Sequence, residues 1–330
     1  MRRRWGPWIA CTCTLVPAQA ASDAPLVAPT LCEASAALAA PWDPALVLVA
    51  DNEVDEQLFG FAREGERLVF RRALALPKEG RPHDTEALAA VGGQLLVVGS
   101  HGPSRSGEPK PKRARLAFYE PDGAGGALRL VRALDDAARL DAARRNLAAC
   151  VDGLFVSPAP LQAGAVCRAL VAGAPQFEGA AALSGPDGGA PRVWLGLRTP
   201  LVEGQAVLLR LTPDLEQLRF DAVALADLEG RGVRELAVSG GTLAGIAGQP
   251  TDGGPPPRLW LTPAAGLRDG ATLAPRWGET LPHGAEGLLL VPGGAIVVVD
   301  VNRAGGGASA CSGPARQLFV RWPEDATERR

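Results

Sequence analysis

The stretch Phe177-Glu178-Gly179-Ala180-Ala181, followed after a turn by Val193-Trp194-Leu195-Gly196-Leu197-Arg198, is the unit from which the chain is built. It consists of an acidic residue, a short apolar strand, a Gly/Pro-rich turn and a second apolar strand that ends on a polar side chain. Variants of this unit begin at four other positions, Glu33, Glu86, Arg234 and Glu286. Such internal repetition predicts an all-β repeat fold and argues against a β-sandwich, which has no internal period of this kind.

The repeat starts are separated by 53, 92, 56 and 52 residues. We expect four strands in each unit, at 33–39, 45–51, 57–63 and 67–76; 86–91, 94–100, 114–119 and 127–134; 178–183, 192–198, 206–212 and 218–226; and 234–239, 242–248, 258–262 and 271–276. The last unit has only three, at 286–291, 295–300 and 316–322, and a strand at 25–31 could complete it and close the ring. The pattern predicts a five-bladed β-propeller. Six blades, with one hidden in 150–176, is the alternative.

The long second interval holds an insertion after the second blade, at about 135–176. Its first part is an Ala-rich amphipathic stretch, for which we expect one helix at about 135–149. Asp135 and Asp136 suit the start of a helix, and Asp141 and Arg145 form a favourable i,i+4 pair. A Gly/Pro-containing loop bracketed by Cys150 and Cys167 follows. Residues 21–330, including this insertion, are interpreted as a single propeller domain.

Residues 1–20 have the pattern of a secretory signal peptide: a basic start, a short apolar run and a small-x-small cleavage site at Ala18-Gln19-Ala20. The apolar run is shorter than the roughly 20 residues that a bilayer requires. We therefore expect a periplasmic or extracellular protein without a membrane span. Without this segment the chain carries 31 basic and 36 acidic residues, a net charge of −5, which argues against nucleic acid as a partner.

Four cysteines remain after cleavage, Cys32, Cys150, Cys167 and Cys311. An even number in an oxidising compartment predicts two disulfides with three pairings to choose from. Cys150 with Cys167 is the local pairing, and it would leave Cys32 with Cys311.

In a propeller, the first strand of each blade lines the central channel, and the start of that strand lies on the same face as the end of the second strand. The repeat therefore places Glu33, Glu86, Glu178, Arg234 and Glu286 in one ring around the channel mouth. Just outside it we expect Asp51, Glu53, His101, Arg198, Gln249, Asp300 and Asn302. These residues are the candidate site for a small polar ligand.

Several carboxylates around one axis repel each other, so something must compensate their charge. One answer is Ca²⁺, a hard cation that prefers oxygen ligands, held by Glu33, Glu86, Glu178 and Glu286. A second is Arg234, which replaces Glu in its repeat, with help from Arg231 and Arg198. Water and backbone N–H groups are a third. The sequence requires no cofactor, and calcium remains open.

The loop after His101 carries Arg105, Lys110, Lys112, Arg113 and Arg115 and overhangs the same face. It could form an anion-binding rim above the channel, or it could be a solvated charged loop. His101 is a candidate general base with Glu86 as its orienting partner, or a structural histidine. His83 and His283 each precede a repeat-start Glu by three residues.

Four segments, Leu228–Leu236, Gly196–Leu201, Val98–Gly102 and Asp51–Glu53, together resemble an uncharacterised bacterial family, domain of unknown function 3616, over nearly all of the mature chain. This resemblance implies an exported β-propeller without an established activity. More distantly, the Glu-Gly strand starts are similar to those of the esterase-like phytase and gluconolactonase propellers. That similarity implies calcium at the four Glu positions, from which Arg234 departs.

Three functions follow as hypotheses. The first is an exported propeller that binds a small polar or anionic ligand at the channel mouth. The second is a calcium-dependent hydrolase of phosphoesters or lactones, with His101 or Glu86 as base and Arg198, Arg231 and Arg234 as anion clamps. The third is a protein-interaction scaffold that docks a partner protein through the helix at 135–149.

Overall fold

The computed structural model describes residues 22–301 and 314–322, except for 105, 107, 109, 124, 186–188, 213–215 and 252. The expected signal peptide at 1–20 lies outside the described residues, as do Arg105, Asn302 and Cys311. Within the described ranges, no helix is both long and apolar enough to cross a membrane.

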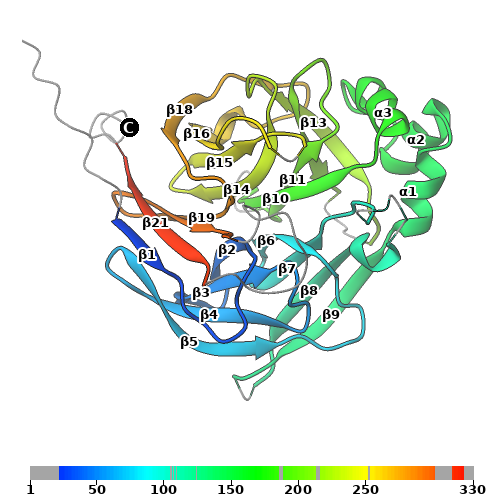
Figure 1. The fold of residues 1–330 in the computed structure, drawn as a ribbon. Helices are drawn as coiled ribbons and strands as arrows, with labels where there is room; N and C mark the ends of the chain where they lie inside the picture. The colour runs from blue at the N-terminus through cyan, green and yellow to red at the C-terminus, as the bar shows by residue number, and fades with distance from the viewer. Residues whose placement is uncertain are drawn as a thin grey trace, which may run out of the picture.

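Five sheets, each starting from one repeat of the sequence, are arranged around a common axis (Figure 1). Blade 1 contains β2 (Ala34–Ala40), β3 (Asp43–Asp51), β4 (Gln57–Glu64) and β5 (Arg67–Ala75). Blade 2 contains β6 (Thr85–Val91), β7 (Gln94–Gly99), β8 (Arg115–Pro121) and β9 (Leu128–Asp135). Blade 3 contains β10 (Gln176–Leu183), β11 (Arg192–Thr199), β12 (Ala206–Leu211), β13 (Phe220–Ala226) and the short β17 (Thr272–Leu273).

The last two blades complete the ring. Blade 4 contains β14 (Gly232–Ser239), β15 (Thr242–Gly248), β16 (Arg258–Pro263) and β18 (Arg276–Thr280). Blade 5 contains β19 (Ala285–Val291), β20 (Gly294–Val299), β21 (Arg316–Arg321) and β1 (Ser22–Pro25). The innermost strands β2, β6, β10, β14 and β19 each contact the next one around the axis, and β19 returns to β2. The prediction of a five-bladed propeller is confirmed.

The N-terminal strand closes the ring, as predicted, but its position differs. β1 pairs antiparallel with β21, from Ser22 opposite Phe319 to Pro25 opposite Arg316 (Figure 1). The strand expected at 25–31 is therefore wrong except at its first residue. Leu26 lies just past the strand and is fully buried, because its side chain belongs to the core between blades 5 and 1.

The core consists of five apolar layers, one between each pair of neighbouring blades. Successive side chains of a strand point to opposite faces of a sheet, so each apolar strand contributes to two layers. In β3, for example, Val47 and Val49 face blade 5, whereas Leu46 and Leu48 face blade 2. This two-sided burial explains why the inner strands are continuous apolar runs.

The insertion after blade 2 contains three helices rather than the single predicted one: α1 (Ala137–Ala143), α2 (Leu147–Leu154) and α3 (Ala163–Ala172). Asn146 ends the first helical segment because it is the N-cap of α2, where its side chain accepts a hydrogen bond from the Ala149 amide at 2.9 Å. No sixth blade exists at 150–176, since α2 and α3 occupy that segment.

The helices complete the core between blades 2 and 3. Leu140 of α1, Leu154 of α2 and Leu170 of α3 are buried in the same apolar layer as Phe177 and Phe220. The predicted disulfide between Cys150 and Cys167 joins α2 to α3. Cys32 is also disulfide-bonded, and its expected partner Cys311 lies beyond the described residues.

One further strand assignment is wrong. The segment expected at 271–276 as the outer strand of blade 4 instead contributes β17, which pairs parallel with β13 of blade 3. The outer strand of blade 4 is β18, which begins directly after Pro275, a residue without an N–H for a sheet ladder. Its Trp277 lies opposite Trp260.

Candidate functional site

The first strand of every blade carries one bulged residue near its start. The pairing with the second strand skips one residue between Ala34 and Ala36, between Thr85 and Ala87, between Phe177 and Gly179, between Val233 and Glu235, and between Ala285 and Gly287. The skipped residues are Ser35, Glu86, Glu178, Arg234 and Glu286, and all five are buried. Bulges redirect a side chain at sheet ends, so this shared irregularity gives the five side chains equivalent positions in the five blades.

The first blade corrects the predicted ring. Glu33 lies one residue before β2, two residues from the bulge, and Ser35 occupies the equivalent position. The Ser35 hydroxyl donates a hydrogen bond to the carbonyl oxygen of Thr85, 2.6 Å away in blade 2. In the sequence Glu33-Ala34-Ser35-Ala36 the acidic residue stands two positions before the bulge, so the strand register gives the equivalent position to Ser35 and not to Glu33.

Four buried side chains form an ion-pair network across blades 3, 4 and 5. Arg198 Nη1 lies 3.0 Å from Glu178 Oε1, Arg234 Nε lies 3.3 Å from Glu178 Oε2, and Arg234 Nη2 lies 2.5 Å from Glu286 Oε1. Arg198 also donates from Nε to the Gln249 carbonyl at 3.1 Å. Two guanidinium groups thus balance two carboxylates, the arrangement that a buried charge requires.

The four Glu residues assigned to calcium do not fit that role in this structure. Arg234 places a positive charge between Glu178 and Glu286, and Glu33 is out of register with the other three. In the part of the chain that the structure describes, no three His, Cys, Asp or Glu side chains are grouped closely enough to hold a metal ion.

Glu235, the residue after the bulge in blade 4, is one that the sequence analysis missed. The equivalent residues of the other blades are Ala36, Ala87, Gly179 and Gly287, all small. A Cβ atom on Gly287 would lie only 3.0 Å from backbone atoms of Ala36 and Ala37, so the inner strands pack closely. Glu235 is fully buried there, and this burial raises the pKa of its carboxyl well above the usual value.

The predicted residues outside the ring have separate positions. The Asp51 carboxylate accepts hydrogen bonds from four backbone N–H groups, those of Cys32, Glu33, Glu53 and Val54, and thereby holds together the chain before β2 and the chain after β3. Asp300 is buried directly after β20. Arg231 pairs with the exposed Glu229 at 3.2 Å and is not part of the network.

A cavity of about 620 Å³ opens on the mouth face between blades 1 and 2. We call it the mouth cavity; it is lined by Asn52, Glu53, Asp55, His83, Asp84, Lys110, Pro111, Lys112, Arg113 and Arg115. Its walls are the loop after β3, the residues before β6 and the end of the β7–β8 loop, including the short 3-10 turn η1 (Pro111–Arg113). These segments lie where inner strands begin, second strands end and third strands begin, which is the face that the repeat predicts for a site.

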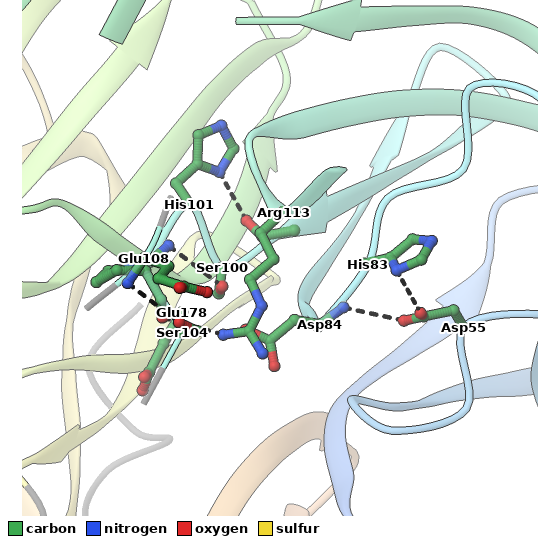
Figure 2. Close-up of polar contacts among 12 residues, drawn as sticks. Asp55, His83, Asp84, Ser100, His101, Ser104, Glu108, Arg113 and Glu178 are labelled. Atoms are coloured by element: carbon green, nitrogen blue, oxygen red, sulfur yellow. Dashed lines mark hydrogen bonds and ion pairs between the residues drawn. The ribbon is translucent and has the colours of Figure 1, made fainter. Parts of the chain in front are cut away.

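A His–Asp hydrogen bond and an Arg–Asp ion pair line this cavity (Figure 2). His83 Nδ1 lies 2.9 Å from Asp55 Oδ2, and Arg113 Nη1 lies 2.9 Å from Asp84 Oδ2. Asp55 also accepts a hydrogen bond from the Asp84 amide at 2.9 Å, which holds Asp84 at a φ of 56°. A left-handed conformation is uncommon for a residue other than glycine and is often found at functional sites.

Burial and neighbouring charges shift the pKa values of Asp55 and His83 in opposing directions. Burial raises the pKa of Asp55, whereas the Asp84 amide and His83 lower it. Burial lowers the pKa of His83 from its usual 6.5; Asp55 raises it, and the positive charges of Lys112, Arg81 and Arg115 lower it further. The net result is a neutral imidazole at pH 7.

His101 lies at the start of the β7–β8 loop, two residues after the end of β7. Its Nδ1 makes a 2.7 Å hydrogen bond with the Gly99 carbonyl, so Gly99, rather than the expected Glu86, orients the ring. The ring packs edge-on against Phe177 and lines a smaller cavity of about 120 Å³ beside α1. Burial lowers the pKa of His101 to about 4, so this imidazole is also neutral at pH 7.

Two comparisons with known sequences bear on the chain. A family model described as "Protein of unknown function (DUF3616)" matches residues 178–260. These residues run from the bulged Glu178 of blade 3 to Trp260 in the third strand of blade 4. They include three members of the ion-pair network, Glu178, Arg198 and Arg234. No curated protein sequence matches the chain.

Solved structures with a similar course of the chain include several propellers. A GH43_1 enzyme from Xanthomonas citri is 11% identical, with 93% of each chain covered and a TM-score of 0.48. A GH43 β-1,3-galactosidase with galactodeoxynojirimycin is 11% identical over 89% of this chain and 92% of that one, with a TM-score of 0.47. A PQQ-bound aldose sugar dehydrogenase from Streptomyces coelicolor is 13% identical over 92% and 99%, with a TM-score of 0.39. Likenesses at this level carry no information on substrate or reaction.

Proposed function

We propose that the protein is an exported β-propeller that binds a small polar ligand bearing a carboxylate or phosphate group in the mouth cavity. The observation that carries this proposal is the cavity itself, whose lining includes four cationic side chains, Lys110, Lys112, Arg113 and Arg115. Its volume of about 620 Å³ is within the usual range for a small-molecule site, about 300–1,000 Å³.

The cations differ in how they are held. Arg113 is fixed by Asp84 and by the Pro103 carbonyl, and Arg115 is fixed by Asp135 at 2.8 Å. Lys112 makes no ion pair with any described residue, and its side chain is exposed. A carboxylate thus balances the charge of each arginine, and Lys112 is the side chain available to pair with an anionic group.

The acidic residues of the lining favour a ligand that also has hydrogen-bond donors. Asp55 and Asp84 are occupied by His83 and Arg113, whereas Glu53 is exposed at the rim. A carboxylate accepts hydrogen bonds from hydroxyl groups, so Glu53 suits a ligand that carries hydroxyls beside its anionic group.

Export is part of the same proposal. It is supported by the signal-like sequence of residues 1–20 and by the disulfide between Cys150 and Cys167, since such bonds persist in oxidising compartments. The helices of the insertion do not favour the scaffold hypothesis, because their apolar side chains Leu140, Leu154 and Leu170 are buried in the protein's own core.

The test is calorimetric titration of the mature protein with glucose 6-phosphate, glucuronate and neutral glucose. We expect binding of at least one of the two anions and none of glucose. An exposed ion pair contributes at most about 1 kcal/mol, so Lys112→Ala should weaken the binding by up to about 5-fold.

Lys78→Ala is the matched control, since Lys78 is exposed and does not line the cavity. It should leave the affinity unchanged. Equal affinities for the three sugars, or an unchanged affinity in Lys112→Ala, would contradict the proposal.

A further inference from the structure

We propose that Asp55 and His83 act together as a general base in the mouth cavity and hydrolyse carboxylic esters of small anionic molecules without a metal. This inference rests on the proposed function, because the same cavity must first hold the anionic group. It assigns ester hydrolysis to the cavity that the proposed function treats as a binding site.

The geometry is that of a base held by an orienting carboxylate. Asp55 Oδ2 lies 2.9 Å from His83 Nδ1, so Nδ1 carries the proton and donates it to the carboxylate. The lone pair of the neutral ring is then on Nε2, for which the described residues provide no hydrogen-bond partner. Figure 2 shows the ring nitrogen that faces Asp55 and the second one pointing away from it.

Hydrogen bonds with backbone groups hold both Asp55 and His83 in place. Asp55 Oδ1 accepts from the Asp84 amide at 2.9 Å, and the His83 amide donates to the Lys112 carbonyl at 3.0 Å. The base is thereby tied to the loop that carries the cations of the cavity. The His83 ring is about one third exposed on the cavity wall.

The protonation state suits a base. The charged and titratable groups around His83 are Asp55 and Asp84 on the acidic side and Lys112, Arg81 and Arg115 on the basic side. Burial is the largest influence and lowers the pKa of His83 below 6.5, so the ring is neutral and able to accept a proton at pH 7.

The magnitude of general-base catalysis selects the substrate class. A positioned base contributes about 10²–10⁴-fold, a factor that suits carboxylic esters. Phosphate monoesters are among the slowest of uncatalysed reactions and need accelerations of up to about 10²¹-fold, so they are excluded as substrates.

Hydrolysis starts with the attack of a water molecule on the ester. His83 Nε2 removes a proton from a water molecule while the water oxygen attacks the ester carbonyl carbon, which gives a tetrahedral oxyanion. The bond to the alkoxy oxygen then breaks, and the imidazolium returns its proton to that oxygen. Ester and water become alcohol and carboxylic acid, and the acid releases one proton to solvent.

The experiment uses 4-acetoxybenzoate, an anionic ester, and its neutral methyl ester as substrates for the mature protein. We expect kcat/KM for the anionic ester to exceed that for the neutral one at least 10-fold, and His83→Gln to lower it about 10²-fold or more. His283→Gln is the matched control, because His283 stands at the same position before the bulge of blade 5 and should leave turnover unchanged.

Asp55 is a positioning residue, and its test is the pH profile. The rate should rise with pH as His83 loses its proton and level off before pH 7. Because the Asp55 charge raises the pKa of His83, Asp55→Asn should lower kcat and move the rising limb to lower pH. A residue needed only for folding would not move that limb.

The outcomes separate the two proposals. Binding of glucose 6-phosphate or glucuronate without ester hydrolysis above the His83→Gln rate overturns this inference and leaves the proposed function standing. Absence of anion binding in the titration overturns both. Hydrolysis that His83→Gln does not reduce, with the variant's fold checked by circular dichroism, also overturns the inference.

Discussion

Replacing Arg234 by Gln should lower the thermal unfolding temperature by about 6–10 °C. Arg234 pairs with both Glu178 and Glu286, and its side chain is 9% exposed. Removing one member of a buried pair costs about 3–5 kcal/mol, because the remaining charge stays buried. A domain of this size loses about 2 °C per kcal/mol.

The assay is differential scanning calorimetry or fluorescence-monitored unfolding of the mature protein. Arg321→Gln is the control: it removes an Arg from a pair with Glu66 that is exposed on both sides, 57% and 38%. An exposed pair contributes at most about 1 kcal/mol, so this control should unfold within about 2 °C of the wild type.

A double variant tests the reason for the loss. Arg234→Gln with Glu286→Gln leaves Arg198 and Glu178 as one balanced pair, so it should recover more than half of the lost stability. Unfolding of Arg234→Gln within 2 °C of the wild type, or a double variant less stable than the single one, would refute this account of the ion-pair network.

Three other changes have defined outcomes. His101→Gln should reduce the loss of stability on acidification, because the folded protein keeps His101 neutral down to about pH 4 whereas the unfolded chain protonates it near pH 6.5. Between pH 6.5 and pH 4 the free energy of unfolding of the wild type should fall by about 3 kcal/mol more than that of the variant, as measured by urea unfolding. Gly232→Ala should destabilise by about 1–3 kcal/mol and disturb the network, because its Cβ would lie 1.9 Å from the Arg198 carbonyl oxygen, and unchanged unfolding would contradict this close approach. Replacing Cys150 and Cys167 by Ser should cost about 3 kcal/mol by loop-closure entropy and raise amide exchange in α2 and α3 before the blades, which hydrogen-exchange mass spectrometry can follow.

The sequence predicted the blades well because each blade repeats one local pattern. Apolar runs bounded by Gly and Pro turns gave the inner strands to within one or two residues, and the shared blade at the termini followed from the missing strand. The errors fall where pairing, not local pattern, decides. Residues 271–276 divide between two blades, and only the partner strands β13 and β16 determine this.

The ring of mouth residues was nearly predicted, and the error has a single cause. Every blade carries the bulge, but in blade 1 it falls at Ser35, two residues after Glu33, and nothing in the Ala-rich segment Glu33–Ala37 marks that position. The compensation by Arg234 and Arg198 was among the predicted answers, since a basic residue replaces Glu in one repeat.

The mouth cavity was predicted only in part. The basic loop after His101 was predicted to be either an anion-binding rim or a solvated charged loop. Five of the candidate positions line the cavity: Glu53, Lys110, Lys112, Arg113 and Arg115. Asp55 and His83 are 28 residues apart and belong to different blades, so no local motif joins them. Their contact arises only when blades 1 and 2 pack together.

The most direct test of the account is a backbone amide shift map of the labelled mature protein with glucose 6-phosphate or glucuronate, whichever binds more tightly. The account predicts shifts concentrated at residues 52–55, 83–84 and 110–115, which line the mouth cavity, with little change at the buried network of Glu178, Arg198, Arg234 and Glu286. Shifts centred on the network instead, or no shifts at millimolar ligand, would contradict the central claim that the protein binds its ligand between blades 1 and 2.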